Sequence, residues 1–242
     1  MTSWGETATI LGVAAALKND DIVFCQYREM GVLYYRGFSI KDITDNCVGN
    51  INDRVKGRQM PIHFTARNIG IMSISSPLGT QIGQAAGYGY GLAMDKSDDI
   101  AVVFFGDGTA SEGDFYAGLN FAQTLGGNTL FICRNNQYAI STHISENTSG
   151  DHIAPKAMAF GMKTIRVDGN DALAVYNATK YAKEYSQKEN QPVFIECMSY
   201  RVGDHSTSDH SVLYRKQDEI DFYKKEYNPI QRLGKYKKRI IY

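Results

Sequence analysis

The stretch that decides the fold runs from Phe104 to Gly127 and reads FFGDGTASEGDFYAGLNFAQTLGG. It places Asp107 between two glycines, directly after the apolar run IAVVFF (100–105). A continuous apolar run of this length is typical of a strand that is buried on both faces. The two glycines allow a close backbone approach and unusual dihedral angles around the carboxylate. The sequence therefore predicts a buried strand that ends at a polar, glycine-flanked turn.

The residues after this turn have the spacing of a helix. Ser111 and Asp114 form an S-x-x-D pattern, which predicts a helix-capping start at this point. Apolar side chains then recur on one helical face at Phe115, Leu119, Ala122 and Leu125.

The rest of the chain repeats this alternation of strands and helices. Further strands are expected over 129–134, 164–167 and 193–200, and helices over 79–94 and from 172 onward. Strand–helix–strand repeats with short connections predict an α/β fold. We expect a doubly wound, mostly parallel sheet with flanking helices.

Length and charge limit the class of protein. The 242 residues are enough for one sizeable domain, which we expect over 1–242. The 26 Lys and Arg balance the 26 Asp and Glu, which argues against nucleic acid or a membrane surface as partner. The basic run KYKKR near the C-terminus is typical of a solvated helix end. No apolar stretch is long enough to span a bilayer. Four scattered cysteines without CxxC spacing indicate buried, reduced thiols in a reducing compartment: Cys25, Cys47, Cys133 and Cys197.

Asp107 is a candidate metal ligand. In a doubly wound sheet, ligands bind at the carboxyl ends of the strands, where a helix N-terminus can also hold a phosphate. A carboxylate beside a phosphate is repelled unless a cation lies between them. Mg²⁺ is a suitable cation, because it is held by one or two protein oxygens together with phosphate oxygens.

Asn136 is a suitable second ligand. It lies at the end of the next expected strand, a separation that a strand–helix–strand unit closes in space.

Two other interpretations of the GDG turn are less consistent with the sequence. A hairpin turn does not fit the helical spacing that follows. A dinucleotide-binding loop needs a third glycine where Ser111 stands.

GDG followed by 26 residues and NN (135–136) matches the motif of thiamine diphosphate-dependent enzymes. The surrounding residues resemble more narrowly the alpha subunits of the branched-chain 2-oxo acid dehydrogenase decarboxylating component. Pyruvate dehydrogenase alpha subunits typically have GDGAANQGQ and GHSMSD, where this chain has GDGTASEGD and HSTSD. The resemblance extends from about Ser3 to Arg232 and is carried by QYREMGVLYYRG, GNINDRVKGRQMPIHF, SISSPLGTQIGQA, GDGTASEGDFYAGLNFA, CRNNQYAIST, IRVDGNDALAVYNATK, ENQPVFIE and YRVGDHSTSDHSVLYR.

The resemblance implies roles for individual residues. Asp107 and Asn136 look like side-chain Mg²⁺ ligands, and the main-chain carbonyl of Tyr138 looks like a third ligand. A further set resembles the contacts to thiamine diphosphate: Gln26, Tyr27, Arg28, Ser76, Leu78, Gly108, Thr109 and Arg134. Another set resembles a potassium site that orders the neighbouring loop: Ser75, Pro77, Thr80 and Gln81.

The polar loop over 200–215 carries two more candidates. His205 resembles the family's active-site histidine for acyl transfer to lipoamide, a role suited to an imidazole that holds both proton states near neutral pH. Ser206 resembles an inhibitory phosphorylation site, where a phosphate would add charge beside the diphosphate. Because the loop is polar and aperiodic, we expect it to be mobile alone and ordered by cofactor and partner.

The reaction implied is the family's oxidative decarboxylation of branched-chain 2-oxo acids. The C2 carbanion of the cofactor attacks the 2-oxo carbon, CO₂ leaves, and the acyl fragment passes to a lipoyl group. The family's glutamate facing the aminopyrimidine comes from a beta subunit, which implies an alpha2-beta2 heterotetramer. The lipoyl domain of the acyltransferase component and a regulatory kinase are further expected partners. The expected location is the mitochondrial matrix, or the cytoplasm in a bacterium.

Some residues depart from the family's pattern. Asp204, His210 and Lys216 stand where the family commonly has histidine, aspartate and a second phosphorylatable serine. The family's N-terminal helices and C-terminal tail are also missing, so we expect a trimmed or partial subunit. Two alternatives stay open from the sequence: an alpha subunit of pyruvate or acetoin dehydrogenase, and a non-catalytic phosphate-binding module.

Overall fold

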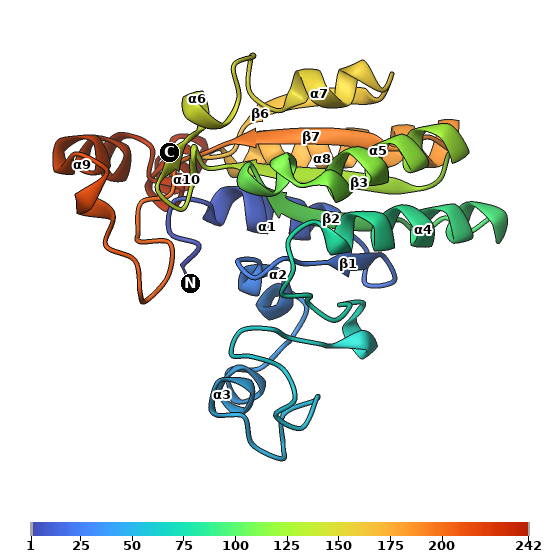
Figure 1. Cartoon of the computed structure of the whole chain (residues 1–242), viewed down its shortest axis with the longest axis horizontal. Coiled ribbons are helices and arrows are strands. Elements are labelled where there is room, and N and C mark those ends of the chain that lie inside the picture. Colours follow the sequence, from blue (N-terminus) through green and yellow to red (C-terminus); the bar gives the residue numbers. More distant parts are fainter. Residues whose placement is uncertain (1, 242) are drawn as a thin grey trace.

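A computed structural model describes residues 2–241 and shows a five-stranded sheet (Figure 1). The strand order is β1-β2-β3-β7-β6, and every neighbouring pair is parallel. The predicted α/β class and parallel sheet are therefore confirmed. The strands are β1 (Ile22–Phe24), β2 (Ala101–Gly106), β3 (Thr129–Asn135), β6 (Lys163–Asp168) and β7 (Val193–Met198).

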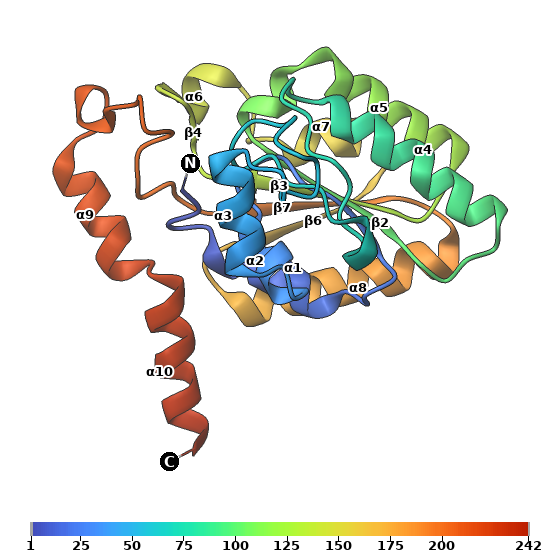
Figure 2. The ribbon, with the colours of Figure 1, turned by 90° about the horizontal axis from the view of Figure 1, so that it is seen from below.

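Helices cover both faces of the sheet, which gives three layers (Figures 1 and 2). Each face has its own apolar core. The helices of one face are α1 (Thr7–Ala16), α2 (Met30–Tyr35) and α8 (Ala172–Glu189), and those of the other are α4 (Thr80–Met94), α5 (Gly113–Leu125) and α7 (Ala154–Ala159).

Strand β2 is apolar throughout because both of its faces are covered. In β2, Val102 and Phe104 belong to the core beneath α1 and α8. Their neighbours Val103 and Phe105 belong to the core beneath α4 and α5. Side chains alternate between faces along a strand, so apolar residues at successive positions of β2 fill the core on each side of the sheet.

The remaining elements lie around this three-layer body. Among the helices of residues 2–241, none has both the length and the apolar character needed to cross a membrane. Helix α10 extends away from the sheet in Figure 2 and carries the basic run near the C-terminus. The elements outside the three layers are α3 (Ile40–Val48), the hairpin of β4 (Tyr138–Ala139) and β5 (Thr142–His143), α6 (Ile144–Asn147), α9 (Gln217–Glu226), α10 (Pro229–Ile241) and the 3₁₀ turns Arg67–Ile69, Gly108–Ser111 and Ser211–Leu213.

Three local predictions were wrong. Ser111 does not cap α5: it ends a 3₁₀ turn, and its hydroxyl donates to Asn147 Oδ1 at 2.9 Å. Helix α5 instead starts after Glu112, without a side-chain cap. Leu125 is 54% exposed, because it lies in the last turn of α5, beyond the covered face. Cys47 is exposed, whereas the other three cysteines are buried.

The core beneath α5 should depend strongly on Phe115. Its ring is fully buried and packs edge-on against Phe105, with ring centroids 5.8 Å apart. We expect Phe115→Ala to lower the free energy of unfolding by about 3–5 kcal/mol, because it leaves a cavity. Phe121 lies on the same helix but is 63% exposed, so Phe121→Ala should change it by no more than about 0.5 kcal/mol. Urea unfolding of both variants measures the difference, and equal losses would contradict this assignment of the core.

Candidate functional site

The candidate site lies where β2 and β3 end. Gly106 of β2 pairs in register with Arg134 of β3. Asp107 is the first residue after β2, and Asn136 is the first residue after β3. Both therefore lie at the same edge of the sheet, and both line one pocket. The sequence prediction that these two side chains come together is borne out by this geometry.

Asp107 has the properties of a cation ligand. Its side chain is buried, and its Oδ2 has no hydrogen-bond partner. Burial raises the pKa of Asp107 to about 6, and repulsion from the Glu6 carboxylate adds to the effect. A buried carboxylate without a counter-charge is unfavourable. A cation in the pocket would relieve this cost, so the site fits a hard metal ion.

The two glycines beside Asp107 have different roles. Neither has a positive φ angle, so the prediction of unusual dihedral angles was wrong. A Cβ on Gly108 would lie 2.8 Å from the Cβ of Ala139. Glycine is needed there because the β4 hairpin packs directly on the turn. A Cβ on Gly106 would meet nothing closer than Gln26 Oε1 at 4.0 Å.

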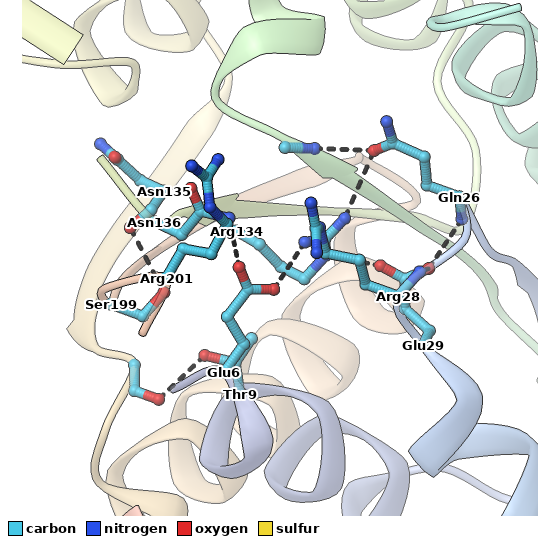
Figure 3. Close-up of polar contacts among 12 residues, drawn as sticks. Glu6, Thr9, Gln26, Arg28, Glu29, Arg134, Asn135, Asn136, Ser199 and Arg201 are labelled. Atoms are coloured by element: carbon cyan, nitrogen blue, oxygen red, sulfur yellow. Dashed lines mark hydrogen bonds and ion pairs between the residues drawn. The ribbon is translucent and has the colours of Figure 1, made fainter. Parts of the chain in front are cut away.

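Arg134 is the centre of a buried ionic cluster (Figure 3). Its Nη1 lies 2.7 Å from Glu6 Oε2, and its Nε lies 2.5 Å from Glu29 Oε1. Its Nη2 donates to Gln26 Oε1 at 3.3 Å. Burial alone would lower the pKa of Arg134, but the Glu29 and Glu6 carboxylates raise it above its usual value. The guanidinium also lines the pocket, and its predicted contact with a diphosphate stays a prediction.

Asn136 and Tyr138 supply the other two predicted metal ligands. Asn136 is buried, its Nδ2 donates to Glu6 Oε1, and its Oδ1 accepts the Tyr138 N–H at 3.2 Å. The carbonyl oxygen of Tyr138 accepts a hydrogen bond from Arg201 Nη1 at 3.1 Å. The expected third ligand is thus shared with a guanidinium in this structure. Arg201 also holds the next turn through the Ile140 carbonyl at 2.7 Å.

The predicted cofactor contacts surround the same pocket, with one exception. Gln26 accepts the Gly106 N–H at 2.9 Å and donates to Thr109 Oγ1 at 3.1 Å, so it joins the ends of β1 and β2. Ser76 is exposed and is not part of the pocket wall. The predicted residues that line the wall are Gln26, Tyr27, Arg28, Leu78, Gly108, Thr109 and Arg134.

His205 lies in the pocket wall beside Arg28. The Arg28 Nη2 is 3.0 Å from His205 Nδ1 and also donates to the His205 carbonyl at 3.2 Å. Burial lowers the pKa of His205 to about 4, and the Arg28 and Arg201 charges add to this effect. The imidazole is therefore neutral at pH 7 in this state.

The residues predicted for potassium lie at the start of α4. Gln81 is buried, and its Nε2 donates to the Phe104 carbonyl at 3.2 Å, while its Oε1 has no partner. Thr80 Oγ1 donates to the Pro77 carbonyl at 3.2 Å. A buried amide oxygen without a donor fits a monovalent cation ligand. Ser75 is half-buried beside these residues.

The loop over 200–215 is held by polar contacts. Arg215 is buried and lies over the rings of Tyr138 and Tyr200, at 5.2 and 5.3 Å from their centroids. Asp204, one of the departures from the family's pattern, accepts the Ser211 N–H at 2.9 Å. Half-buried Ser206 follows His205. The loop thus gains its order from charge and aromatic contacts, which apolar patterning alone does not reveal.

Sequence reasoning missed three carboxylates at the site. Glu6 and Glu29 are fully buried partners of Arg134, and Glu112 is an exposed residue of the pocket wall. Glu6 lies 128 positions from Arg134, so no local pattern could have paired them. Within residues 2–241, no group of three or more His, Cys, Asp or Glu side chains is arranged to hold a metal ion.

Comparison with known proteins agrees with this geometry. The family model described as Dehydrogenase E1 component matches residues 1–240. The chain belongs to this family. The E1 dehydrogenase family is thiamine diphosphate-dependent, which fits a pocket with an unpaired buried carboxylate at the end of β2.

Individual E1 relatives are similar over nearly the whole chain. The 2-oxoisovalerate dehydrogenase subunit alpha 1, mitochondrial, of Arabidopsis thaliana is 53% identical over 236 residues, which cover 98% of this chain and 50% of the relative. The Dictyostelium discoideum and Homo sapiens alpha subunits are 52% and 51% identical, again over 98% of this chain and over 54% and 53% of their own lengths. The chain spans about half the length of the curated relatives it matches.

The contact between Arg28 and His205 predicts a measurable shift. We expect Arg28→Gln to raise the pKa of His205 above about 4, because it removes the nearest positive charge. The pKa should stay below the ordinary value of about 6.5, because burial is the larger cause and remains. A pH titration of histidine ring carbon signals by NMR measures this shift. Arg58→Gln, at an exposed position, is the control, and an unchanged His205 pKa in Arg28→Gln would contradict the assignment.

Proposed function

We propose that this chain is the alpha subunit of a thiamine diphosphate-dependent branched-chain 2-oxo acid dehydrogenase, acting on 3-methyl-2-oxobutanoate and related acids. One observation carries the proposal: the buried Asp107 carboxylate has an unpartnered oxygen beside Asn136 at the carboxyl edge of the sheet. The chain is 53% identical to an alpha subunit of 2-oxoisovalerate dehydrogenase from Arabidopsis thaliana. The names of these relatives supply the substrate class.

The residues of this chain would bind the phosphate end of the cofactor. Asp107, Asn136 and the Tyr138 carbonyl would hold Mg²⁺, and Arg28 with Gln26 would face the diphosphate. The potassium site at Gln81 would order the loop before α4. When bound, the cofactor supplies the nucleophilic carbon for decarboxylation. His205, at the pocket wall, would exchange a proton during acyl transfer to lipoamide.

The proposal includes partners and a location. A beta subunit would complete the site in an alpha2-beta2 heterotetramer, and a lipoyl domain of the acyltransferase component would accept the acyl group. A phosphate on Ser206 would place negative charge next to His205 and Arg28, which supports regulation by a kinase. The mitochondrial names of the relatives support the mitochondrial matrix as location.

Removal of the metal ligand is the direct test. We expect Asp107→Asn to abolish decarboxylation and to weaken Mg²⁺-dependent binding of thiamine diphosphate by about 100-fold, about 2.8 kcal/mol, because an anionic ligand becomes neutral. Titration calorimetry on the complex with the beta subunit measures the affinity. Asp114→Asn, an exposed carboxylate of α5, is the matched control. Near-normal affinity in Asp107→Asn would refute the metal assignment.

Substrate preference tests the narrower part of the proposal. We expect the complex with its beta subunit to prefer branched 2-oxo acids to pyruvate by at least about tenfold in kcat/KM, about 1.4 kcal/mol in transition-state binding. Decarboxylation assays with 3-methyl-2-oxobutanoate and pyruvate, run on the same preparation, give the ratio. A preference for pyruvate would instead assign the chain to the pyruvate type.

A further inference from the structure

Glu6 connects the ionic cluster to the predicted metal site (Figure 3). Its side chain is fully buried at the start of α1. One carboxylate oxygen lies 2.7 Å from Arg134 Nη1. The other accepts a hydrogen bond from Nδ2 of Asn136. A single carboxylate thus contacts a guanidinium on one side and a predicted metal ligand on the other.

The contact fixes which way the Asn136 amide faces. A carboxylate is only an acceptor, so it can bind the NH₂ side of the amide but not the oxygen side. Oδ1 is consequently directed away from Glu6, where it accepts the Tyr138 N–H at 3.2 Å. The two hydrogen bonds of the Asn136 amide therefore place its oxygen on the side away from Glu6.

We propose that Glu6 is a positioning residue for the metal site, which keeps the oxygen of Asn136 available as a ligand. The inference rests on the proposed function, because it concerns the same ion. Groups that orient metal ligands through a second hydrogen bond typically change metal affinity by 10- to 100-fold when they are removed. Nothing in the family resemblance assigned a role to Glu6.

Charge balance shows that Glu6 does more than neutralise Arg134. Glu29 already lies 2.5 Å from the same guanidinium. Burying another carboxylate costs several kcal/mol unless further partners compensate it. The cluster holds three carboxylates, those of Glu6, Glu29 and Asp107, and one guanidinium group, that of Arg134. A cation bound at Asp107 would offset the excess negative charge.

The backbone around Glu6 is held in place by the segment after β7. The Val202 N–H donates to the Trp4 carbonyl at 3.1 Å. Gly5 has a φ of +98°, and a Cβ there would lie 1.9 Å from the carbonyl oxygen of Tyr200. Only glycine fits this contact. The position of the Glu6 carboxylate is thus set by packing on both sides.

An exchange of charge between two positions tests the proposal. Glu6→Gln puts an NH₂ group against either Arg134 or Asn136, and in the second case the Asn136 amide turns over. Asn136→Asp sets two carboxylates face to face. The double variant Glu6→Gln with Asn136→Asp restores a donor–acceptor pair, conserves the total charge and keeps an oxygen toward the ion. Glu6→Gln alone should therefore be defective where the double variant is not.

The experiment measures Mn²⁺ affinity by electron paramagnetic resonance, on the complex with the beta subunit and at saturating thiamine diphosphate. Glu6→Gln should bind Mn²⁺ at least about tenfold more weakly, and the double variant should return to within about threefold of the unmodified protein. Glu29→Gln is the matched control, because it removes a buried carboxylate from the same guanidinium without touching Asn136. It should stay within about threefold.

A second measurement separates positioning from a structural role. Thermal unfolding without metal or cofactor should show similar losses for Glu6→Gln and Glu29→Gln, because both leave Arg134 with one carboxylate. Unaltered Mn²⁺ affinity in Glu6→Gln would overturn the proposal, as would a double variant no better than Glu6→Gln or an equal loss in Glu29→Gln. If the unmodified complex binds no Mn²⁺ with thiamine diphosphate, the proposed function itself fails.

Discussion

The buried guanidinium of Arg134 is the interaction on which the site depends. It extends from the end of β3 and binds Glu6 from the start of α1, and Glu29 and Gln26 from the segment after β1. A buried charge that loses its partner typically costs 3–5 kcal/mol. The three segments are far apart in sequence, so this cost fixes their positions relative to the edge of the sheet.

Burial shifts the pKa values of Asp107 and His205 in opposite directions. Burial makes the Asp107 carboxylate unfavourable by itself and therefore receptive to a cation. Burial and the Arg28 guanidinium hold His205 neutral. A bound diphosphate would bring negative charge to Arg28 and reduce its effect on the imidazole. The proton affinity of His205 would then depend on whether a diphosphate is bound beside Arg28.

The sequence predicted the parts of the fold that follow from periodicity. Strand β2 was recognisable because both of its faces are covered, and Asp107 and Asn136 were paired because parallel strands end at one edge. The start of α5 was misplaced, because the GDG turn continues as a 3₁₀ turn through Ser111 before the helix begins. The burial of Glu6 could not be predicted, because its partner Arg134 lies 128 positions away and no local pattern connects the two.

The contacts of the loop over 200–215 could not be predicted from its composition. Its polar sequence offers little apolar burial, which is the usual source of order, and its predicted ordering by cofactor and partner stays a prediction. Here Arg201 and Arg215 are buried instead, and their guanidinium groups bind main-chain carbonyls and lie against tyrosine rings. Such contacts join residues by geometry and leave no periodic signal.

The pocket divides into a buried end and an open end, and this division bears on how the site would be completed. Asp107, Asn136 and Arg134 are buried at the sheet edge, whereas Ile140, also in the wall, is 52% exposed. Ile140 has a φ of 55°, which is unfavourable for a β-branched residue. Its carbonyl is held by Arg201, so a buried guanidinium maintains a strained turn at the mouth.

The carboxylates in the described wall are Asp107, which would be occupied by the metal, and exposed Glu112. If the reacting end of the cofactor needs a buried acid, that acid must approach the open side, which is where a beta subunit would have to bind.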